Sequence, residues 1–253
     1  HQFGAYHTMN KCDRGNQFTG SEVEPGSGSS IIGYAGICNP NVQFNSDAHF
    51  NYVNIKQIAD YVINETGASC AGVFPIANQA PIANAGPDYT IPTNTAFVLT
   101  GSASDGDGLN SLTYNWSQND PNFPPGDTAP QSDWAQGALY RSLLPSSSPT
   151  RYFPELSQVV NGKIRTTWEV TPSVARTLNF AFTVRDNGSG FSGDNGIGQV
   201  DADLMKVTVI ETGSAFEVTS QNERHSWDVG AQETVVWNVA GTSSNGINVS
   251  HVD

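Results

Sequence analysis

The feature that most limits the fold is a series of short segments in which apolar and polar residues alternate. They lie at 95–104, 111–118, 165–172, 175–186 and 202–211, and Gly, Asp, Asn and Pro separate them. Successive side chains of a strand point to opposite faces of a sheet, so this alternation predicts strands with one buried face. Evenly spaced short strands predict a β-sandwich over residues 85–212, with residues 127–156 as a long insertion that covers one edge.

The composition limits the possible partners. The net charge is −13, from 11 basic and 24 acidic residues. Nucleic acids and anionic membranes require clustered Lys and Arg, so neither is expected as a partner. No apolar run approaches the roughly 18 residues that a membrane-spanning helix needs. Abundant Gly and Pro with only 14% charged residues are typical of an extracellular β-rich protein, and five Trp, eight Tyr and twelve Phe provide material for a core.

Residues 1–72 have a different character from the rest of the chain. Residues 46–67 contain apolar side chains at approximately helical spacing, and these are Phe50, Val53, Ile58, Tyr61 and Val62. We expect a helix there, capped by Ser46 or Asn54 and ended by Gly67. Residues 73–84 contain Pro75 and Pro81 and are expected to be a linker.

The alternating pattern starts again at the end of the chain. Residues 214–221 and 233–241 are strand-like. Two or three strands cannot bury a sandwich core, so residues 213–253 are expected to be the truncated start of a second β-sandwich.

The cysteines indicate a disulfide. Cys12, Cys38 and Cys70 contain no CxxC pair, which makes a cysteine zinc site improbable. Three pairings are possible. Of these we favour Cys12–Cys38, with Cys70 paired to a residue upstream of His1.

The first seven residues contain the pattern His1-x-x-Gly4-x-x-His7. This is the second half of HExxHxxGxxH, in which a helix supplies two zinc-binding histidines, a glycine turns the chain and a third histidine follows. The helical glutamate of that motif is the general base. We therefore predict His1 and His7 as zinc ligands; the alternative is that His7 is a surface or satisfied core residue.

Longer stretches strengthen this interpretation. GAYHTMN (4–10), EPGSGS (24–29) and GYAGIC (33–38) stand in this order before the expected helix. The sequence resembles the bacterial secreted reprolysin-like zinc peptidases of the metzincin group, and the β-region resembles the modules that follow their catalytic domain. The resemblance implies the α+β C-terminal part of a metzincin catalytic domain over 1–72, followed by all-β immunoglobulin-like or PKD-like sandwiches.

The resemblance also assigns roles to individual residues. Ile32 stands where the metzincins have the methionine of their Met-turn. Tyr34, two residues later, is a candidate for stabilising the transition state through its hydroxyl group, or else packs beneath the histidines. The first histidine and the glutamate of the motif would precede His1. We therefore expect a fragment that begins inside the motif and is inactive by itself.

Other polar residues suggest weaker sites. Asp105 and Asp107 could bind calcium, as could Asp186, Asn187, Asp194 and Asn195, although Asp/Asn/Gly turns are the favoured explanation of both stretches. Glycosylation sequons occur at Asn64, Asn115, Asn187 and Asn248. The remaining histidines, His49, His225 and His251, are isolated in the sequence and are expected in solvent.

Two functions follow as hypotheses. The first is a fragment of a secreted zinc metalloendopeptidase that acts on proteins or peptides. The second is a non-catalytic extracellular binding or adhesion protein that works through its β-sandwiches. Because sandwiches have many functions, the fold alone does not separate them.

Overall fold

The computed structural model describes residues 1–70, 72, 74–106, 112–126, 128–188, 197–221, 223, 225–244 and 246–247. Its helices are α1 (Tyr52–Asn64), the 3₁₀ helix η1 (Thr66–Ser69) and the short α2 (Leu156–Val159). Its strands are β1 (Ile82–Asn84), β2 (Tyr89–Pro92), β3 (Phe97–Thr100), β4 (Ser102–Ser104), β5 (Thr113–Gln118), β6 (Thr150–Phe153), β7 (Arg176–Arg185), β8 (Val200–Ile210), β9 (Glu217–Val218) and β10 (Trp237–Asn238). The chain is therefore mostly β in its regular structure, with several small sheets.

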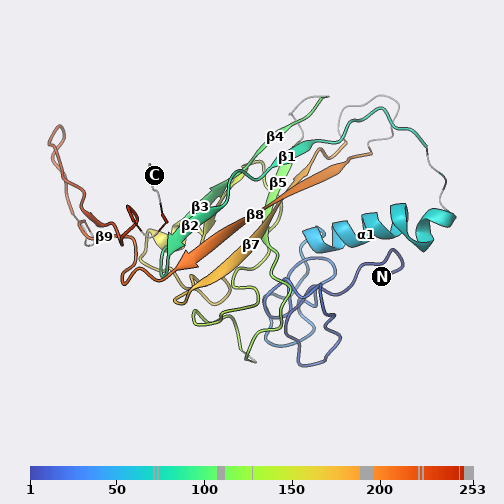
Figure 1. Ribbon diagram of the computed structural model, residues 1–253, viewed down its shortest axis with the longest axis horizontal. Coiled ribbons are helices and arrows are strands. Elements are labelled where there is room, and N and C mark those ends of the chain that lie inside the picture. Colours follow the sequence, from blue (N-terminus) through green and yellow to red (C-terminus); the bar gives the residue numbers. More distant parts are fainter. Residues whose placement is uncertain are drawn as a thin grey trace.

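A four-stranded sheet in the order β2-β8-β7-β5 is the centre of the molecule (Figure 1). The long strands β7 and β8 pair antiparallel, with Phe180 opposite Met205, and β2 runs parallel to β8. The two-stranded sheets β1-β4 and β3-β6 complete an arrangement compatible with a β-sandwich. The long alternating segments thus form the strands that the sequence predicts.

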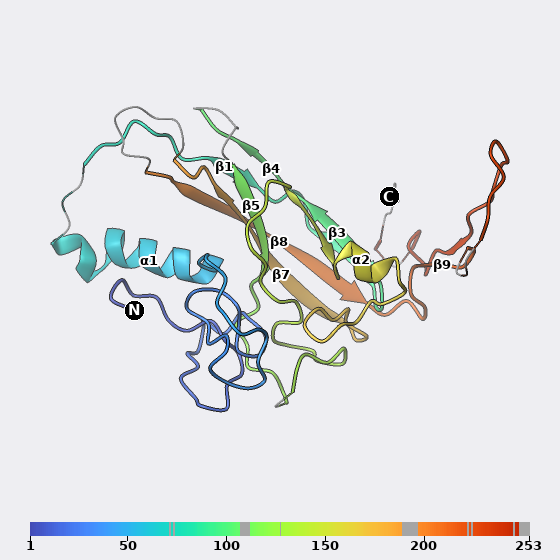
Figure 2. The same cartoon turned by 180° about the vertical axis from the view of Figure 1, so that it is seen from behind.

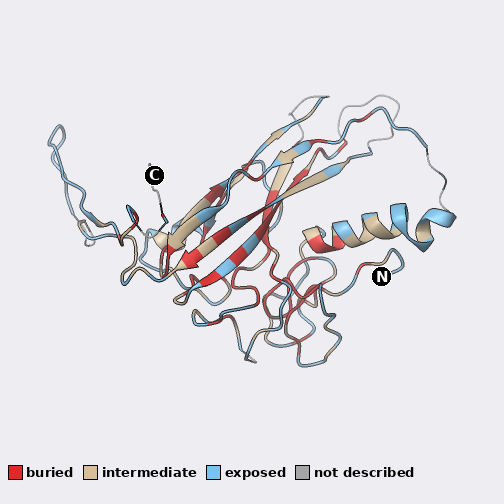
Figure 3. Ribbon diagram, in the orientation of Figure 1, coloured by how far each residue is buried: buried red, intermediate tan, exposed pale blue. Residues whose placement is uncertain are grey.

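The main core lies on one face of this sheet and is aromatic. Phe153, Phe180 and Phe182 are fully buried, and Trp116 is 2% exposed. The rings of Phe153 and Phe180 lie 4.8 Å apart, and those of Trp116 and Phe182 lie 4.7 Å apart. The buried colour in Figure 3 accordingly follows the central strands. Burial of these large side chains is the main favourable contribution to folding of this region.

Two expectations for the β-region are wrong in detail. Residues 165–172 form no strand and take part only in isolated bridges, such as Tyr140 with Glu169. The insertion 127–156 is more than an edge cover, because it supplies strand β6 and the buried side chains Trp134 and Leu139. Within 165–172, Glu169 instead forms an ion pair, and its carboxylate lies 2.8 Å from the guanidinium group of Arg151.

The N-terminal residues are mostly loops packed beside α1 (Figure 2). The predicted helix is present, but its cap is Asn51, whose side chain accepts a hydrogen bond from the Val53 amide. Ser46 and Asn54 do not cap it, and the helix ends at Asn64, before Gly67. A β-conformation at Asn51 together with a carboxamide oxygen over the first turn is the usual N-cap arrangement.

The disulfide Cys12–Cys38 is confirmed, with its Cα atoms 5.4 Å apart. Met9 is buried against it and Tyr34 packs on the same cluster. Cys70 is an exposed free thiol within the described residues. The bridge closes a loop of N-terminal chain that has little regular structure of its own, which limits the freedom of the unfolded chain.

The insertion and the N-terminal residues are joined by buried hydrogen bonds. The Ser142 hydroxyl accepts from the Asn51 side chain at 2.9 Å, and the Ser142 carbonyl accepts from the Ser29 hydroxyl at 3.0 Å. Arg141 lies 3.7 Å from the carboxylate of Asp47. Residues far apart in sequence therefore share one interface between the first 70 residues and the sandwich.

Residues beyond β8 lead away from the far end of the sheet (Figure 1). Within the described part of this segment, β9 and β10 pair over two residues each, and most side chains are exposed. No helix in the described residues is both long and apolar enough to cross a membrane.

Candidate metal centre

The chain turns sharply between the two histidines of the N-terminal pattern. The Gly4 amide donates to the His1 carbonyl at 3.1 Å, and Gly4 has φ +77°. A Cβ atom at this position would lie 2.9 Å from Cβ of Tyr61 on α1. Both the left-handed backbone and the close approach of α1 require glycine here.

This turn brings His1 and His7 together. Their ring centroids are 4.4 Å apart with the planes at 75°. His1 is exposed and His7 is half-buried. The structure therefore places the two predicted ligands side by side, although they are separated by a glycine turn in the sequence.

Each ring has one nitrogen held by a backbone carbonyl. Nδ1 of His1 lies 2.6 Å from the carbonyl oxygen of Ala5, and Nδ1 of His7 lies 2.9 Å from that of Ile32. A carbonyl oxygen only accepts hydrogen bonds, so each Nδ1 must carry the proton. In a neutral imidazole the other nitrogen, Nε2, then carries the lone pair. A carbonyl behind a histidine ligand is the usual way that proteins fix the ring for a metal.

Tyr34 lies directly against His7. The two ring centroids are 4.4 Å apart at 73°. The Tyr34 hydroxyl accepts a hydrogen bond from the Asn16 side chain at 3.1 Å. These contacts match the packing role more closely than the catalytic one, although the phenol proton itself is still available to donate.

Sequence reasoning missed Glu24, which connects the segment after His7 to the segment before Ile32. Its side chain is fully buried and its carboxylate accepts from the hydroxyls of Thr8 and Ser30. The backbone amides of Ser29 and Ser30 also donate to it, each at 3.1 Å. Thr8 follows His7, and Ser30 precedes Ile32, so Glu24 ties the ligand segment to the carbonyl that orients it. Glu24 stands two residues after Glu22 and just before a stretch rich in Ser and Gly, and a carboxylate beside so many donors is the signal that could have revealed it.

Few described residues other than the two histidines could bind a metal. The only group of three or more close metal-binding side chains in the described residues is Cys12, Asp13 and Cys38. Because its two cysteines are bonded to each other, it offers no thiolate. Zinc in a catalytic site takes three protein ligands, and no third His, Cys, Asp or Glu of the described residues groups with His1 and His7.

The calcium hypothesis gains little support. Asp105 is half-buried just after β4, and Asp107 lies outside the described residues, as do Asp194 and Asn195. The Asp186 carboxylate accepts from the Asn78 side chain and from the amides of Gly188 and Gln199, so it organises a turn. Turn chemistry therefore accounts for Asp186.

One further expectation is corrected, and one sequon has a structural role. His49 is 5% exposed, not solvated, because the sandwich packs over the loop that carries it. Asn115 is buried and its side chain donates to the Leu143 carbonyl at 2.6 Å, so the asparagine of this sequon has a structural role. His225 is exposed as expected, while His251 and Asn248 lie outside the described residues.

The comparisons with known proteins identify no relative. No protein-family description matches the chain, and no curated protein matches it.

Proposed function

We propose that this chain is part of a secreted zinc-dependent metalloendopeptidase in which His1 and His7 are two of the zinc ligands. The observation that supports this most is the pair of carbonyl acceptors at Nδ1 of both rings. Two adjacent imidazoles with their Nε2 lone pairs free are a chelating pair. The glycine turn between them is the one that the motif requires.

The protein residues have separate tasks in this proposal. When bound, zinc would act as a Lewis acid on the scissile carbonyl and would activate a water molecule. Ile32 orients His7 through its carbonyl group, Glu24 holds the backbone that carries Ile32, and Tyr34 supports the His7 ring. The third ligand and the glutamate base of the motif are not among these residues, so the 253-residue chain alone is expected to be inactive.

The rest of the molecule agrees with an extracellular location. A disulfide suits an oxidising compartment. We assign the β-region to an immunoglobulin-like or PKD-like sandwich that accompanies the catalytic part, and residues 213–253 to the start of a second one. Proteins or peptides are the proposed substrates.

Zinc titration followed by long-range ¹H–¹⁵N NMR of the histidine rings tests the ligands. His1 and His7 should both show an unprotonated Nε2, and zinc should shift these two signals first. His7→Ala should weaken zinc binding at least about tenfold, whereas the exposed control His225→Ala should not. Equal effects of the two variants would contradict the assignment.

The four residues encoded before His1 test the enzyme class. His-Glu-x-x at that place, together with chelator-sensitive proteolysis by the longer protein, is the expected result. Any other residue at the His or Glu position would rule out an active enzyme of this type.

The second candidate function is extracellular binding through the β-modules. Exposed apolar side chains in the last segment favour it, among them Trp227 (55% exposed) and Trp237 (44% exposed). Aromatic side chains of this kind are common in recognition surfaces. Binding that survives removal of zinc and is lost in Trp227→Ala would support this function over the peptidase.

A further inference from the structure

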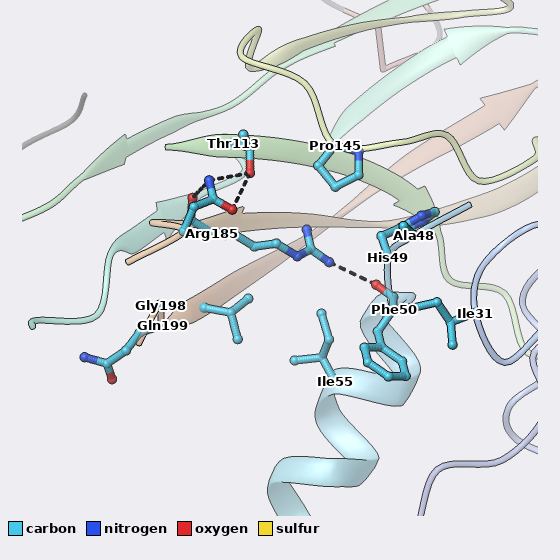
Figure 4. A pocket seen from close by; sticks show the side chains of 12 residues that line it. Ile31, Ala48, His49, Phe50, Ile55, Thr113, Pro145, Arg185, Gly198 and Gln199 are labelled. Carbon is cyan, nitrogen blue, oxygen red and sulfur yellow. Dashed lines mark hydrogen bonds between the residues drawn. The ribbon is translucent and has the colours of Figure 1, made fainter. Parts of the chain in front are cut away.

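A pocket of about 580 Å³ lies where the first 70 residues meet the sandwich (Figure 4). One wall is the chain around the start of α1, and the other includes the ends of β5, β7 and β8. None of the pocket residues is a proposed zinc ligand, so an inference about this pocket does not depend on the zinc site.

The pocket contains an arginine that has no carboxylate partner among the described residues. Arg185, at the end of β7, extends into the pocket, and its Nη2 donates to the Phe50 carbonyl at 2.9 Å. Its Nη1 is buried and has no hydrogen-bond partner. In the described part of the chain, no ion pair involves this guanidinium group. Burial lowers the pKa of Arg185 to about 10, and no acidic group of the described residues counteracts this shift.

Three other arginines, which are also largely buried, differ in this respect. Arg141, Arg151 and Arg176 each lie within ion-pair distance of an aspartate or glutamate. A buried cation left unpaired is costly, and an unfilled donor next to a cavity indicates a missing acceptor. Arg185 is therefore unusual in a chain whose net charge is −13.

His49 adds a second polar group without a partner. Both of its ring nitrogens are buried and lack hydrogen-bond partners in the part of the chain that the structure describes, and the residue lines the same pocket. Burial lowers the pKa of His49, so the ring is neutral and offers one N–H donor and one acceptor. The carboxylates nearest to it are otherwise engaged, since Asp47 faces Arg141 and Glu24 accepts from hydroxyls and amides.

Most of the remaining wall is apolar. Ile31, Phe50, Ile55, Pro145 and Val200 line it, and Figure 4 shows Ile31, Phe50 and Ile55 on the side opposite Thr113. Its volume is in the range of small-molecule sites, roughly 300–1,000 Å³. A cationic group in a largely apolar pocket favours a ligand with one anionic group and an apolar body.

We propose that this pocket binds an apolar molecule that ends in a single carboxylate, with the carboxylate accepting hydrogen bonds from the Arg185 guanidinium group. Planar carboxylates match the fork of donors that a guanidinium presents. Both an aliphatic acid and the carboxyl end of an apolar peptide have this chemistry.

Binding of four probes to the 253-residue chain tests the proposal by calorimetry. Hexanoate and N-acetyl-leucine should bind at least about tenfold more tightly than acetate, because their apolar parts are buried. N-acetyl-leucinamide has no carboxylate and should not bind. Tighter binding of hexanoate would identify the ligand as an aliphatic acid. Tighter binding of N-acetyl-leucine would identify it as the carboxyl end of a peptide. Equal binding of the amide, or no binding of any carboxylate, would overturn the proposal.

Substitutions locate the site. Arg185→Gln should abolish binding, whereas Arg165→Gln, at an exposed arginine on the sandwich, should retain it. Circular dichroism of both variants establishes that they are folded, and Val200→Asp, which adds a negative charge to the wall, should abolish binding by a second route. Equal loss in Arg165→Gln would overturn the assignment.

Asp194 lies outside the described residues. A more than tenfold gain in affinity on Asp194→Asn would show that the chain's own carboxylate fills the pocket, which would also overturn the proposal.

Discussion

Glu24 is the residue whose surroundings most constrain the candidate metal centre. Hydroxyl and amide donors from Thr8, Ser29 and Ser30 surround its carboxylate, and it has no contact with solvent. Hydrogen bonds to a buried charged acceptor are stronger than those between neutral groups. This side chain links the segment after His7 to the turn that contains Ile32.

Glu24→Gln should lower the free energy of unfolding by about 2 kcal/mol, because the new amide group places donors against donors. Urea denaturation measures the change. Glu217→Gln, at an exposed position on β9, is the matched control and should leave stability unchanged. Similar values for the two variants would show that the Glu24 network contributes nothing.

Gly4 offers a second prediction with an internal control. Gly15 has nearly the same backbone conformation, φ +74°, but no atom lies within 4 Å of an added Cβ. Gly15→Ala should therefore cost only the left-handed conformation, about 1 kcal/mol, while Gly4→Ala should cost about 2–4 kcal/mol because of Tyr61. Equal costs in denaturation experiments would mean that α1 moves aside freely.

His49 predicts a dependence of stability on pH. Burial, the largest cause, lowers its pKa from the usual 6.5; Arg185 lowers it further, and Glu24 and Asp47 oppose the shift. As the pH falls below about 6.5, His49 therefore binds a proton more readily in the unfolded chain than in the folded chain, and stability is lost. His49→Phe should reduce this loss, as measured by denaturation between pH 7 and 5. The exposed His225→Gln variant should show the same pH dependence of stability as the unsubstituted protein. If His49→Phe also shows that unchanged pH dependence, the prediction is wrong.

At the scale of elements, the start of α1 depends on the sandwich. Asn51 caps the helix through its carboxamide oxygen and uses its nitrogen to donate to Ser142, which lies in the insertion. One side chain thus completes a helix cap and an interface contact. The insertion that the sequence marks only as long and irregular is what makes this possible.

Ser142→Ala should leave the Asn51 donor buried without a partner, at a cost of about 1–2 kcal/mol. Amide hydrogen exchange should accelerate in the first turn of α1 rather than in the sheet. Ser173→Ala removes a hydroxyl contact with Ser132 inside the sandwich and serves as the control. Faster exchange confined to the sheet in Ser142→Ala would refute the coupling.

At the scale of the whole molecule, burial is uneven. The central sheet and the Glu24 region are buried, whereas the segment around residues 225–239 is almost entirely exposed (Figure 3). Local opening requires least free energy where few contacts must be broken. The first 70 residues and the sandwich, by contrast, share buried contacts and should unfold together.

A glutamate-specific protease should therefore cut the native chain first after Glu233, which is exposed and lies outside the strands. Buried Glu24 and Glu169 should resist cleavage until global unfolding. Mass spectrometry of early fragments measures the order. A first cut between β1 and β8 would contradict this distribution of stability.

Much of the sandwich follows from local sequence. The segments at 111–118, 175–186 and 202–211 became β5, β7 and β8, because alternation sets which side chains share a face whatever the strand's partner is. Residues 165–172 have the same alternation and form no strand, since Glu169 and Trp168 are used in contacts with the insertion and the N-terminal loops. Of the candidate site, the two histidines and the glycine between them were visible in the sequence because they lie within seven residues.

Local pattern by itself thus determined the long strands β5, β7 and β8, a helix within residues 46–67 and the turn at Gly4, all of which depend on neighbours along the chain. Only the tertiary structure decided between the three cysteine pairings and buried Glu24 and His49. It also placed Arg185 at a pocket where no carboxylate of the described residues pairs with it. These features depend on which surfaces meet across long stretches of chain. Burial and hydrogen bonding depend on all groups around an atom, and a linear pattern contains only those on its own segment.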